Sequence, residues 1–315
     1  MTNKALGGDL NPFGGIATYM KCEPTRNLEN VDVAVVGVPF DSGTSGRSGS
    51  RLGPRSIRLA SLNLWGFHPH HQIAPTEVLK VVDYGDVDVL PPNIDLTMDV
   101  IESTLTEILD SNVTPMILGG DHSIIVPNLR AHAKKFGALG VVHIDAHPDT
   151  WDTEFGALKY SHGTGFRRAC EEGLIDPERY IMVGIRGPVS DADSITDARR
   201  YATRVIDIDE AFEMGIPAII EAIHEVVGEG PVYVSYDIDS CDPAYAPGTG
   251  TPEVGGFTSY QALQLVRGLR GLNLVGCDLV EVNPQYDHGE ITAVLAANLS
   301  FELLTLLALQ KLDAE

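Results

Sequence analysis

The feature that most constrains the fold is an alternation, along the whole chain, of short apolar runs with segments of helical periodicity. The apolar runs predict buried strands at 31–38, 79–83, 114–118, 139–144, 180–184, 204–206, 231–237 and 274–280. Helical patterns begin at residues 54 and 123 and cover 97–110, 167–173, 190–200, 216–227, 258–270 and 290–311. Such alternation is typical of a parallel sheet with helices on both faces, where ligands bind at the carboxyl ends of the strands. The sequence therefore predicts an α/β fold with its functional site at that edge.

The length and composition are those of a single globular domain. The 315 residues are many for one domain, but one continuous α/β sheet of this size can bury a large core. The chain is 43% hydrophobic and 21% charged, and no linker or repeat interrupts the alternation. We therefore expect one domain over residues 1–315. Residues 1–30 contain Gly, Pro and Asn with little periodicity, and we expect them to form an irregular N-terminal arm.

The charge and the cysteines bear on partners and location. A net charge of -22, from 44 acidic and 22 basic residues, argues against a nucleic-acid partner. An acidic field favours cationic ligands, although an acidic surface kept for solubility explains the charge equally well. The four cysteines are scattered without a CxxC pair, which fits a reducing compartment. We find no secretory signal pattern and no apolar run that approaches a bilayer span, so we expect a cytoplasmic protein without a membrane partner.

The central sequence motif lies at 141–150, where an apolar run leads into Asp-x-His-x-Asp. Alternate residues of an extended segment point to one side, so Asp145, His147 and Asp149 can present two carboxylates and an imidazole to one point. This arrangement suits a divalent cation. The alternative is a polar turn, in which Asp149 caps the next helix and His147 is a loop histidine.

The same spacing recurs after the strand at 231–237, which delivers Asp237 and Asp239. His122 follows the strand at 114–118, in a Gly-Gly-Asp-His-Ser turn. If these strand ends converge, four carboxylates and two imidazoles meet, and two divalent cations would neutralise the excess negative charge. A set dominated by oxygen, with two nitrogens and no thiolate, suits manganese, and nickel or cobalt could substitute. Cys241 is expected to be a small packing residue rather than a ligand.

Together these motifs resemble the ureohydrolase (arginase/agmatinase) family, in its agmatinase-like branch. The resemblance covers nearly the whole chain and is carried by the segments GGDHS, DAHPDTWD, HGT, SYDIDSCDPAYAPGTGTPEVGG and DLVEVNPQYDHGEITA. It implies an arginase-like, three-layer α/β/α fold with a central parallel sheet of eight strands. It also implies two Mn²⁺ ions per subunit, hydrolysis of a guanidino compound to urea and an amine, and a homo-oligomer, either a trimer or a hexamer.

The resemblance assigns roles residue by residue. One metal would be held by His122, Asp145, Asp149 and Asp237, and the other by His147, Asp145, Asp237 and Asp239. Glu281 would bind the guanidinium group, for which a carboxylate is the natural partner, and its alternative role is a surface ion pair. His162 would pass protons to the departing amine, with Asp149 able to share that task, although a lone histidine is ordinarily structural. Thr249 is a weaker candidate for substrate contact.

The choice of substrate depends on the loop that follows Asp149. Arginases place a polar loop here to hold a carboxylate. This chain instead has Trp151, Asp152 and Glu154, and the negative charges of the two acids would repel a carboxylate. We therefore expect agmatine, with Glu154 or Asp152 facing its terminal ammonium. Hydrolysis of 4-guanidinobutyrate, 3-guanidinopropionate or guanidine remains open, since the family motifs do not separate these substrates. Trp151 is bulky and could shorten the pocket, which would favour guanidine.

Other readings of the sequence stay open. A catalytically inactive, metal-binding partner subunit would be free to lose ligands, yet all six are present. A one-zinc amidohydrolase of related fold would not need the carboxylates of a second metal. The histidines His68, His70 and His71 lie in a loop without neighbouring carboxylates, so we expect them to be solvated or to lie at the substrate rim. His143, one residue out of register with Asp145, is expected to be a core histidine.

Overall fold

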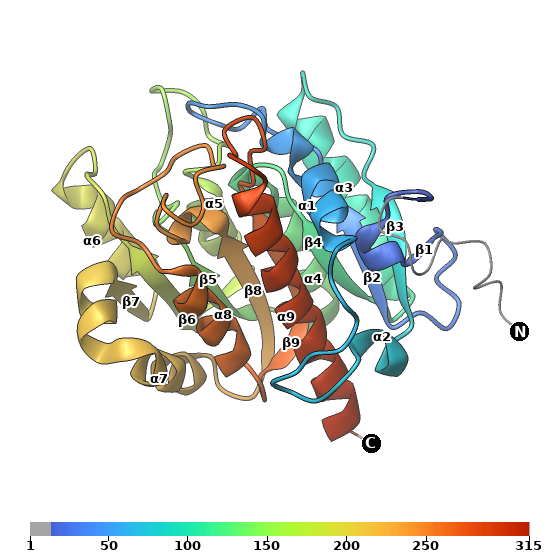
Figure 1. Ribbon diagram of the computed structural model, residues 1–315. Coiled ribbons are helices and arrows are strands. Elements are labelled where there is room, and N and C mark those ends of the chain that lie inside the picture. The colour runs from blue at the N-terminus through green and yellow to red at the C-terminus, as the bar shows by residue number, and fades with distance from the viewer. Residues whose placement is uncertain (1–13, 315) are drawn as a thin grey trace, which may run out of the picture.

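The computed structural model describes residues 14–314, in which nine strands form one parallel sheet. In chain order the strands are β1 (Glu23–Pro24), β2 (Val33–Gly37), β3 (Val81–Asp86), β4 (Thr114–Leu118), β5 (Leu139–Ile144), β6 (Ile175–Ile185), β7 (Arg204–Asp207), β8 (Pro231–Asp237) and β9 (Asn273–Val280). Their order across the sheet is β1-β3-β2-β4-β9-β8-β5-β6-β7. The strands β4, β9, β8 and β5 are therefore neighbours at its centre (Figure 1).

The predicted fold class is confirmed, with one strand more than the expected eight. The extra strand is β1, which has two residues and pairs with β3 at the register Glu23 to Val82. It lies within the segment predicted to be an irregular arm, together with a short 3₁₀ turn at Tyr19–Lys21. The end of that segment is thus attached to the sheet edge, while residues 1–13 lie outside the described residues.

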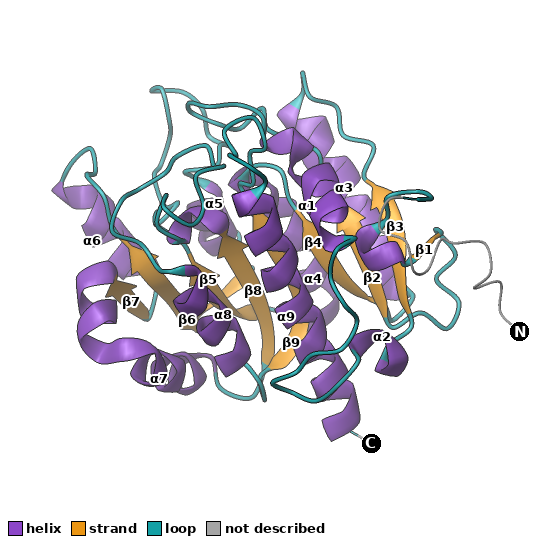
Figure 2. Cartoon of the chain, viewed as in Figure 1, coloured by secondary structure: helices purple, strands orange, loops and turns teal. Residues whose placement is uncertain are grey.

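Helices cover both faces of the sheet and complete three layers (Figure 2). The helices α1 (Gly53–Ser61), α2 (Pro75–Val78), α7 (Ile208–Val227), α8 (Ser259–Gly268) and α9 (Ile291–Asp313) pack against one another on one face. The other face carries α3 (Ile94–Asp110), α4 (Ile125–Phe136), α5 (Gly165–Glu171) and α6 (Ala192–Tyr201). Along β5, Val142 and Ile144 join the core under α7 to α9, and Val141 joins the opposite core. Burial on both faces explains why the strands read as unbroken apolar runs.

The helix α9 corrects one expectation drawn from the sequence. By length and composition its residues could cross a membrane, although we expected no run to approach that length. In the structure 83% of its most apolar window is buried inside the protein. It packs against α1, α2, α8 and β9. The apolar length of α9 is therefore that of a central core helix, whose whole circumference meets protein.

Candidate active site

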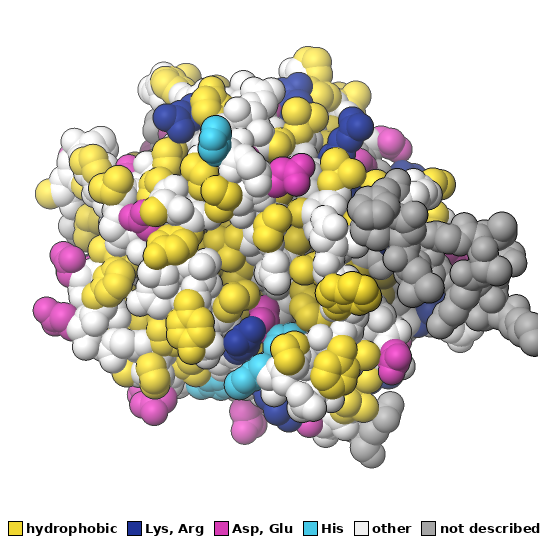
Figure 3. Space-filling model, viewed as in Figure 1, with side chains coloured by type: hydrophobic (Ala, Val, Ile, Leu, Met, Phe, Trp, Pro, Cys, Tyr) yellow, Lys and Arg dark blue, Asp and Glu magenta, His cyan; other side chains and the backbone are white. Residues whose placement is uncertain are grey.

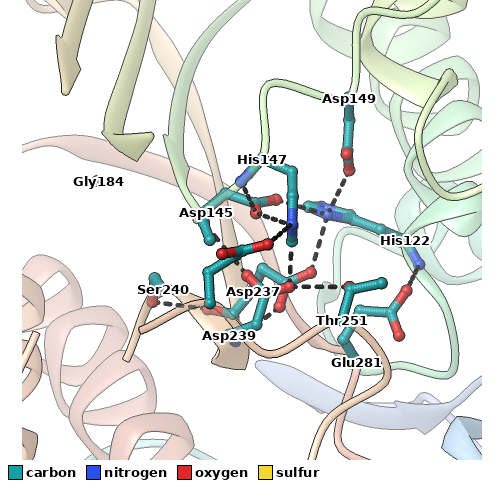
Figure 4. A network of polar contacts seen from close by, with 12 residues as sticks. His122, Asp145, His147, Asp149, Gly184, Asp237, Asp239, Ser240, Thr251 and Glu281 are labelled. Carbon is teal, nitrogen blue, oxygen red and sulfur yellow. Dashed lines mark hydrogen bonds and ion pairs between the residues drawn. The ribbon is translucent and has the colours of Figure 1, made fainter. Parts of the chain in front are cut away.

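The six predicted metal ligands converge at the carboxyl ends of three central strands, β4, β5 and β8. His122 lies in a 3₁₀ turn (His122–Ile124) beyond β4, Asp237 is the last residue of β8, and Asp239 lies two residues further on. The three ligands of the Asp-x-His-x-Asp motif follow β5 directly. Figure 4 shows the six side chains pointing toward one another from these separate segments.

One group of donors surrounds His122. Its Nδ1 lies 3.0 Å from an oxygen of Asp145, 3.0 Å from one of Asp149 and 3.2 Å from one of Asp237. Within the described part of the chain, this buried nitrogen has no hydrogen-bond partner of suitable geometry. On the other side of the ring, Nε2 lies 2.8 Å from the hydroxyl of Ser235, which donates to Asp278. Because that hydroxyl's own hydrogen is engaged, Nε2 carries the ring proton of the neutral imidazole, and the lone pair of Nδ1 points into the space between the carboxylates.

A second group surrounds His147. Its Nδ1 lies 3.1 Å from an oxygen of Asp239 and 3.6 Å from one of Asp145. Asp145 uses its other oxygen toward His122, so it lies between the two groups. Asp237 places one oxygen toward His122, and its other oxygen accepts the backbone N–H of Asp239 at 2.8 Å. The geometry thus gives two adjacent donor sets that share Asp145.

The charges of this cluster do not balance without cations. Burial raises the pKa of Asp237 well above its usual range, and the charges of Asp239 and Asp145 raise it further. Burial opposes the charged imidazole of His122, but contacts with three aspartates outweigh it and raise its pKa well above normal. The protein alone can thus hold the cluster only by keeping protons on it. Four buried carboxylates and two imidazoles, with an orphaned Nδ1 among them, fit two divalent cations.

His162 and Glu281 form a polar pair beside the cluster. His162 Nδ1 lies 3.0 Å from Oε1 of Glu281, and the same oxygen accepts the backbone N–H of His122 at 2.9 Å. Burial lowers the pKa of His162, but the hydrogen bond and charge of Glu281 outweigh it and raise the pKa to about 9. The Nε2 atom faces the hydroxyl of Ser45 at 2.7 Å and its backbone N–H at 3.0 Å. The hydroxyl can accept from the imidazolium or donate to the neutral ring, whereas the backbone N–H can donate to Nε2 only in the neutral ring.

Two residues of this site have a strained backbone conformation. Asp149 and Glu281 have φ of 50° and 63°, in the left-handed region that residues with a side chain rarely adopt. Each such residue costs on the order of 1 kcal/mol. The chain thus accepts strain at two residues whose carboxylates must face the cluster.

A cavity of about 140 Å³ opens above the cluster. Trp151, Glu154, Thr251 and Glu281 line it, together with His162 and metal-ligand candidates. Glu281 Oε2 and Glu154 Oε2 are buried and have no hydrogen-bond partner among residues 14–314. Two carboxylate oxygens at the cavity are therefore left for a cationic ligand.

Two other residues predicted to contact substrate lie elsewhere. Asp152 is 63% exposed and pairs with Arg168 at 3.0 Å, so Glu154 is the acid of this loop that faces the cavity. Thr249 is fully buried in a bridge with Val282, and Thr251 takes its place in the cavity wall of the described structure. Thr249 and Thr251 stand in a Gly-Thr-Gly-Thr segment, so the sequence alone did not show which of the two faces the cavity.

Several residues that support the site were missed by sequence reasoning. Ser235 and Asp278 orient His122, but they lie 113 and 156 positions from it. His143 is buried as expected, yet its Nε2 also reaches Asp145 at 2.8 Å. Arg186 donates to the backbone carbonyls of Asp239, Ser240 and Glu253 and so holds the loop that carries Asp239. The signal available in the sequence was a polar residue inside an apolar strand, which applies to Ser235 in β8, Asp278 in β9 and His143 in β5.

The prediction for the histidine-rich loop was wrong for His68, whereas His70 is exposed as expected. His68 is 2% exposed, and its Nε2 lies 2.8 Å from Oε2 of Glu302 on α9, so a carboxylate does accompany it. His71 is half-buried and His70 is exposed. Within the described residues, none of the three lines the active-site cavity. A carboxylate 234 positions away in the chain could not be paired with this loop from local sequence.

Comparisons with known proteins agree with this geometry. The model of the arginase family matches residues 31–305. A guanidinobutyrase from Pseudomonas aeruginosa is 45% identical over 309 residues, which cover 97% of each chain. A mitochondrial agmatinase from Gallus gallus is 44% identical, over 93% of this chain and 86% of its own. The solved structure of proclavaminate amidino hydrolase from Streptomyces clavuligerus superposes with a TM-score of 0.91 at 42% identity, over 94% of this chain and 98% of the other. Relatives of different substrate specificity are thus almost equally similar.

Proposed function

This chain belongs to the arginase family and is a hydrolase of guanidino carbon–nitrogen bonds, and we propose that it converts agmatine to urea and putrescine. One observation carries the choice of substrate: the unpaired, buried Oε2 of Glu154 at the cavity. Agmatine is cationic at both ends, so Glu281 can bind its guanidinium while Glu154 faces its ammonium. The carboxylate of 4-guanidinobutyrate would instead meet a second anion in a confined space.

Glu281 is proposed to orient the guanidinium. Its Oε1 is occupied by the backbone N–H of His122 and by His162, which leaves Oε2 free. A carboxylate fixed in this way presents one oxygen in a defined direction to a planar cation. Bound cations in the two donor sets would supply a water whose pKa is lowered toward neutrality, as the attacking nucleophile.

His162 is proposed to supply the proton that the departing amine needs. Attack of water at the guanidino carbon and cleavage of the bond to the alkyl nitrogen give urea and an amine that must be protonated. With its pKa raised to about 9, His162 holds a proton at neutral pH. Ser45 at Nε2 accepts from the charged ring and donates to the neutral ring, so the hydrogen-bond network is kept after the proton leaves. Asp149 can share the transfer.

The remaining expectations stay proposals that rest on the resemblance. We propose Mn²⁺ as the resident metal, with Ni²⁺ or Co²⁺ as substitutes, because the donor set is dominated by oxygen. Assembly into homotrimers or hexamers, a cytoplasmic location and a single domain over the whole chain also stay predictions. One sheet runs from residue 23 to residue 280, which supports the single domain.

The substrate is tested by urea release from purified, Mn²⁺-loaded enzyme. We expect the highest kcat/KM with agmatine, compared with 4-guanidinobutyrate, 3-guanidinopropionate and guanidine. A clear preference for guanidinobutyrate would refute the role of Glu154. A preference for guanidine would instead favour the reading in which Trp151, whose ring lies against Gly163, shortens the cavity. Two bound ions without turnover of any of these compounds would indicate a binding subunit.

A matched pair of variants tests Glu154 itself. Glu154→Gln keeps the shape of the side chain but removes its charge, and we expect it to lower kcat/KM for agmatine by roughly 10- to 100-fold. Turnover of guanidine, which lacks the distal ammonium, should change little. Asp152→Asn, in the same loop but exposed, is the control and should leave both substrates unaffected. Equal losses in both variants would show that the loop responds to its overall charge rather than to one contact.

A further inference from the structure

The two histidines among the six metal-ligand candidates differ in what lies behind the ring. His122 is fully buried, and its Nε2 faces the hydroxyl of Ser235, which Asp278 holds. The side chain of His147 is 19% exposed, and its Nδ1 faces the carboxylates of the donor set. A histidine that offers Nδ1 to a cation carries its proton on Nε2, and that proton is ordinarily hydrogen-bonded. His147 therefore needs an acceptor on the outer side of its ring.

Glu253 lies where that acceptor is needed. Its Oε1 is 4.0 Å from Nε2 of His147, whereas Oδ2 of Asp239 is 3.1 Å from Nδ1, so the imidazole stands between two carboxylates. A separation of 4.0 Å is longer than a hydrogen bond, but rotation about the last torsion angle of a glutamate side chain meets little resistance and would close it. Among residues 14–314, the carboxylate of Glu253 has no other ion pair and accepts no hydrogen bond.

An acid without a hydrogen bond is not unusual by itself in this protein. The net charge is -22, and acidic side chains lie scattered over the surface (Figure 3). Glu253 differs from an ordinary surface acid because its side chain is only 24% exposed and its carboxylate packs against the backbone of Gly187. A Cβ at Gly187 would lie 2.5 Å from the carboxyl carbon, so a residue with a side chain would displace the carboxylate. The chain thus keeps a place for this carboxylate beside His147.

The two carboxylates that flank His147 are also fixed relative to each other. Nη2 of Arg186 donates to the backbone carbonyl of Glu253 at 2.8 Å and to that of Asp239 at 2.7 Å. Thr251, in the same loop as Glu253, donates from its hydroxyl to Oδ2 of Asp239 at 3.2 Å (Figure 4). One guanidinium group and one hydroxyl therefore join the loop of Glu253 to the segment that carries Asp239.

We propose that Glu253 is a positioning residue that accepts the Nε2 proton of His147 and so holds Nδ1 toward its donor set. This role rests on the two-cation site of the hydrolase proposed above. A carboxylate behind a metal-binding imidazole fixes the tautomer and the orientation of the ring and makes it a stronger ligand. Asp278 acts on His122 in this way through Ser235, and Glu253 acts on His147 directly.

Two other roles of Glu253 lead to different results. A purely structural role would depend on packing against Gly187, which a glutamine of the same shape preserves. A substrate-binding role would depend on attraction of the ammonium of agmatine, so loss of the charge would affect agmatine and not guanidine. Only the positioning role makes the affinity for one of two metal ions depend on Glu253.

The test is the affinity of the purified full-length chain for Mn²⁺, measured on wild type, Glu253→Gln, Glu253→Ala and the control Asp152→Asn, which removes an exposed acid near the cavity. Metal-stripped protein is titrated with Mn²⁺, and the free ion is followed by electron paramagnetic resonance. We expect wild type and the control to bind two ions with the same affinities. In Glu253→Gln one of the two ions should bind roughly 10- to 100-fold more weakly, and in Glu253→Ala at least as weakly.

Two ions bound with wild-type affinity by both Glu253 variants would overturn this role, whichever substrate the enzyme hydrolyses. Fewer than two ions bound by wild type would instead refute the two-cation site itself, so the two failures are distinguishable.

Urea release gives an independent measurement. At limiting Mn²⁺, Glu253→Gln should be slower than wild type by the same factor with agmatine and with guanidine. Saturating Mn²⁺ should restore most of kcat, because the weakened site is then filled. A rise in KM for agmatine alone, with unchanged metal affinity, would assign Glu253 to the substrate's ammonium and contradict the positioning role.

Discussion

Two clusters in this molecule combine histidines with carboxylates, and they differ in how their charge is balanced. The active-site cluster buries four aspartates with two histidines, and the pKa of Asp237 is raised well above normal by burial and by its aspartate neighbours. The cluster on α9, which consists of His68, His71 and Glu302, has one carboxylate, which Arg267 already neutralises. The comparison teaches that the active site needs cations to be stable in its charged form, whereas the α9 cluster is complete in charge without one.

Two buried or half-buried histidines show the same contrast. Next to Glu281, the pKa of His162 is raised to about 9, because the carboxylate outweighs burial. Next to other histidines, the pKa of His71 is lowered to about 4 by burial and by like charges. One residue type is thus set to carry a proton in one place and a lone pair in the other, by its neighbours alone.

The largest expected effect is on the rate of urea release, which should depend on the active-site cluster and not on the cluster at α9. Asp237→Asn removes a carboxylate that the family resemblance assigns to both metals, so we expect urea release to fall by roughly 10⁴-fold, since the bound water is no longer activated by two cations. The metal content should fall with it. Glu302→Gln, in the other cluster, should leave kcat/KM of the folded enzyme unchanged. Equal losses in the two variants would show that the clusters are not independent.

The next effect concerns the proton held by His162. His162→Asn should lower kcat by roughly 10²- to 10³-fold without loss of metal, because the departing amine loses its proton donor. The wild-type rate should fall as the pH rises through about 9, where the imidazolium is lost. The sign follows from the raised pKa: the protonated form is the stabilised one, so its contribution is present at low pH and lost above pH 9. A variant that kept the alkaline decline would assign it to another group.

Much of the fold could be predicted because the strands are buried on both faces. The strands β4, β5 and β8 match the predicted ranges to the residue, since each apolar run ends abruptly at Gly or Asp. The helix α7 begins at Ile208 rather than at 216, because Gly215, with φ of 74°, interrupts the periodicity that sequence reasoning relies on. The strand β1 is too short to give a periodic signal.

The sequence predicted those site residues whose spacing lies within one short segment. Asp145, His147 and Asp149, two residues apart in sequence, all reach the cluster, but His147 and Asp149 lie in different donor sets that share Asp145, and Asp149 turns inward with a φ of 50° rather than by strand alternation. Contacts between distant segments gave no such signal. Ser45 is 117 positions from His162, and Glu302 is 234 positions from His68, so only the folded chain reveals those partners.

The smallest expected effect is on stability. It distinguishes the two clusters clearly, because a substitution in one should lower the free energy of unfolding and a substitution in the other should raise it. In the metal-free protein, Glu302→Gln weakens the bonds of half-buried Arg267 and buried His68, and we expect the free energy of unfolding to fall by about 2 kcal/mol. Asp237→Asn removes a carboxyl group whose pKa is raised in the folded, metal-free cluster, by burial first and then by Asp239 and Asp145, whereas the unfolded chain ionises it in its usual range. That variant should therefore raise the free energy of unfolding, by about 1 kcal/mol at pH 7, with the gain fading as the pH falls below 4. Urea-induced unfolding in the presence of a chelator measures both, and a loss of stability in Asp237→Asn would contradict the view that uncompensated charge dominates the active-site cluster.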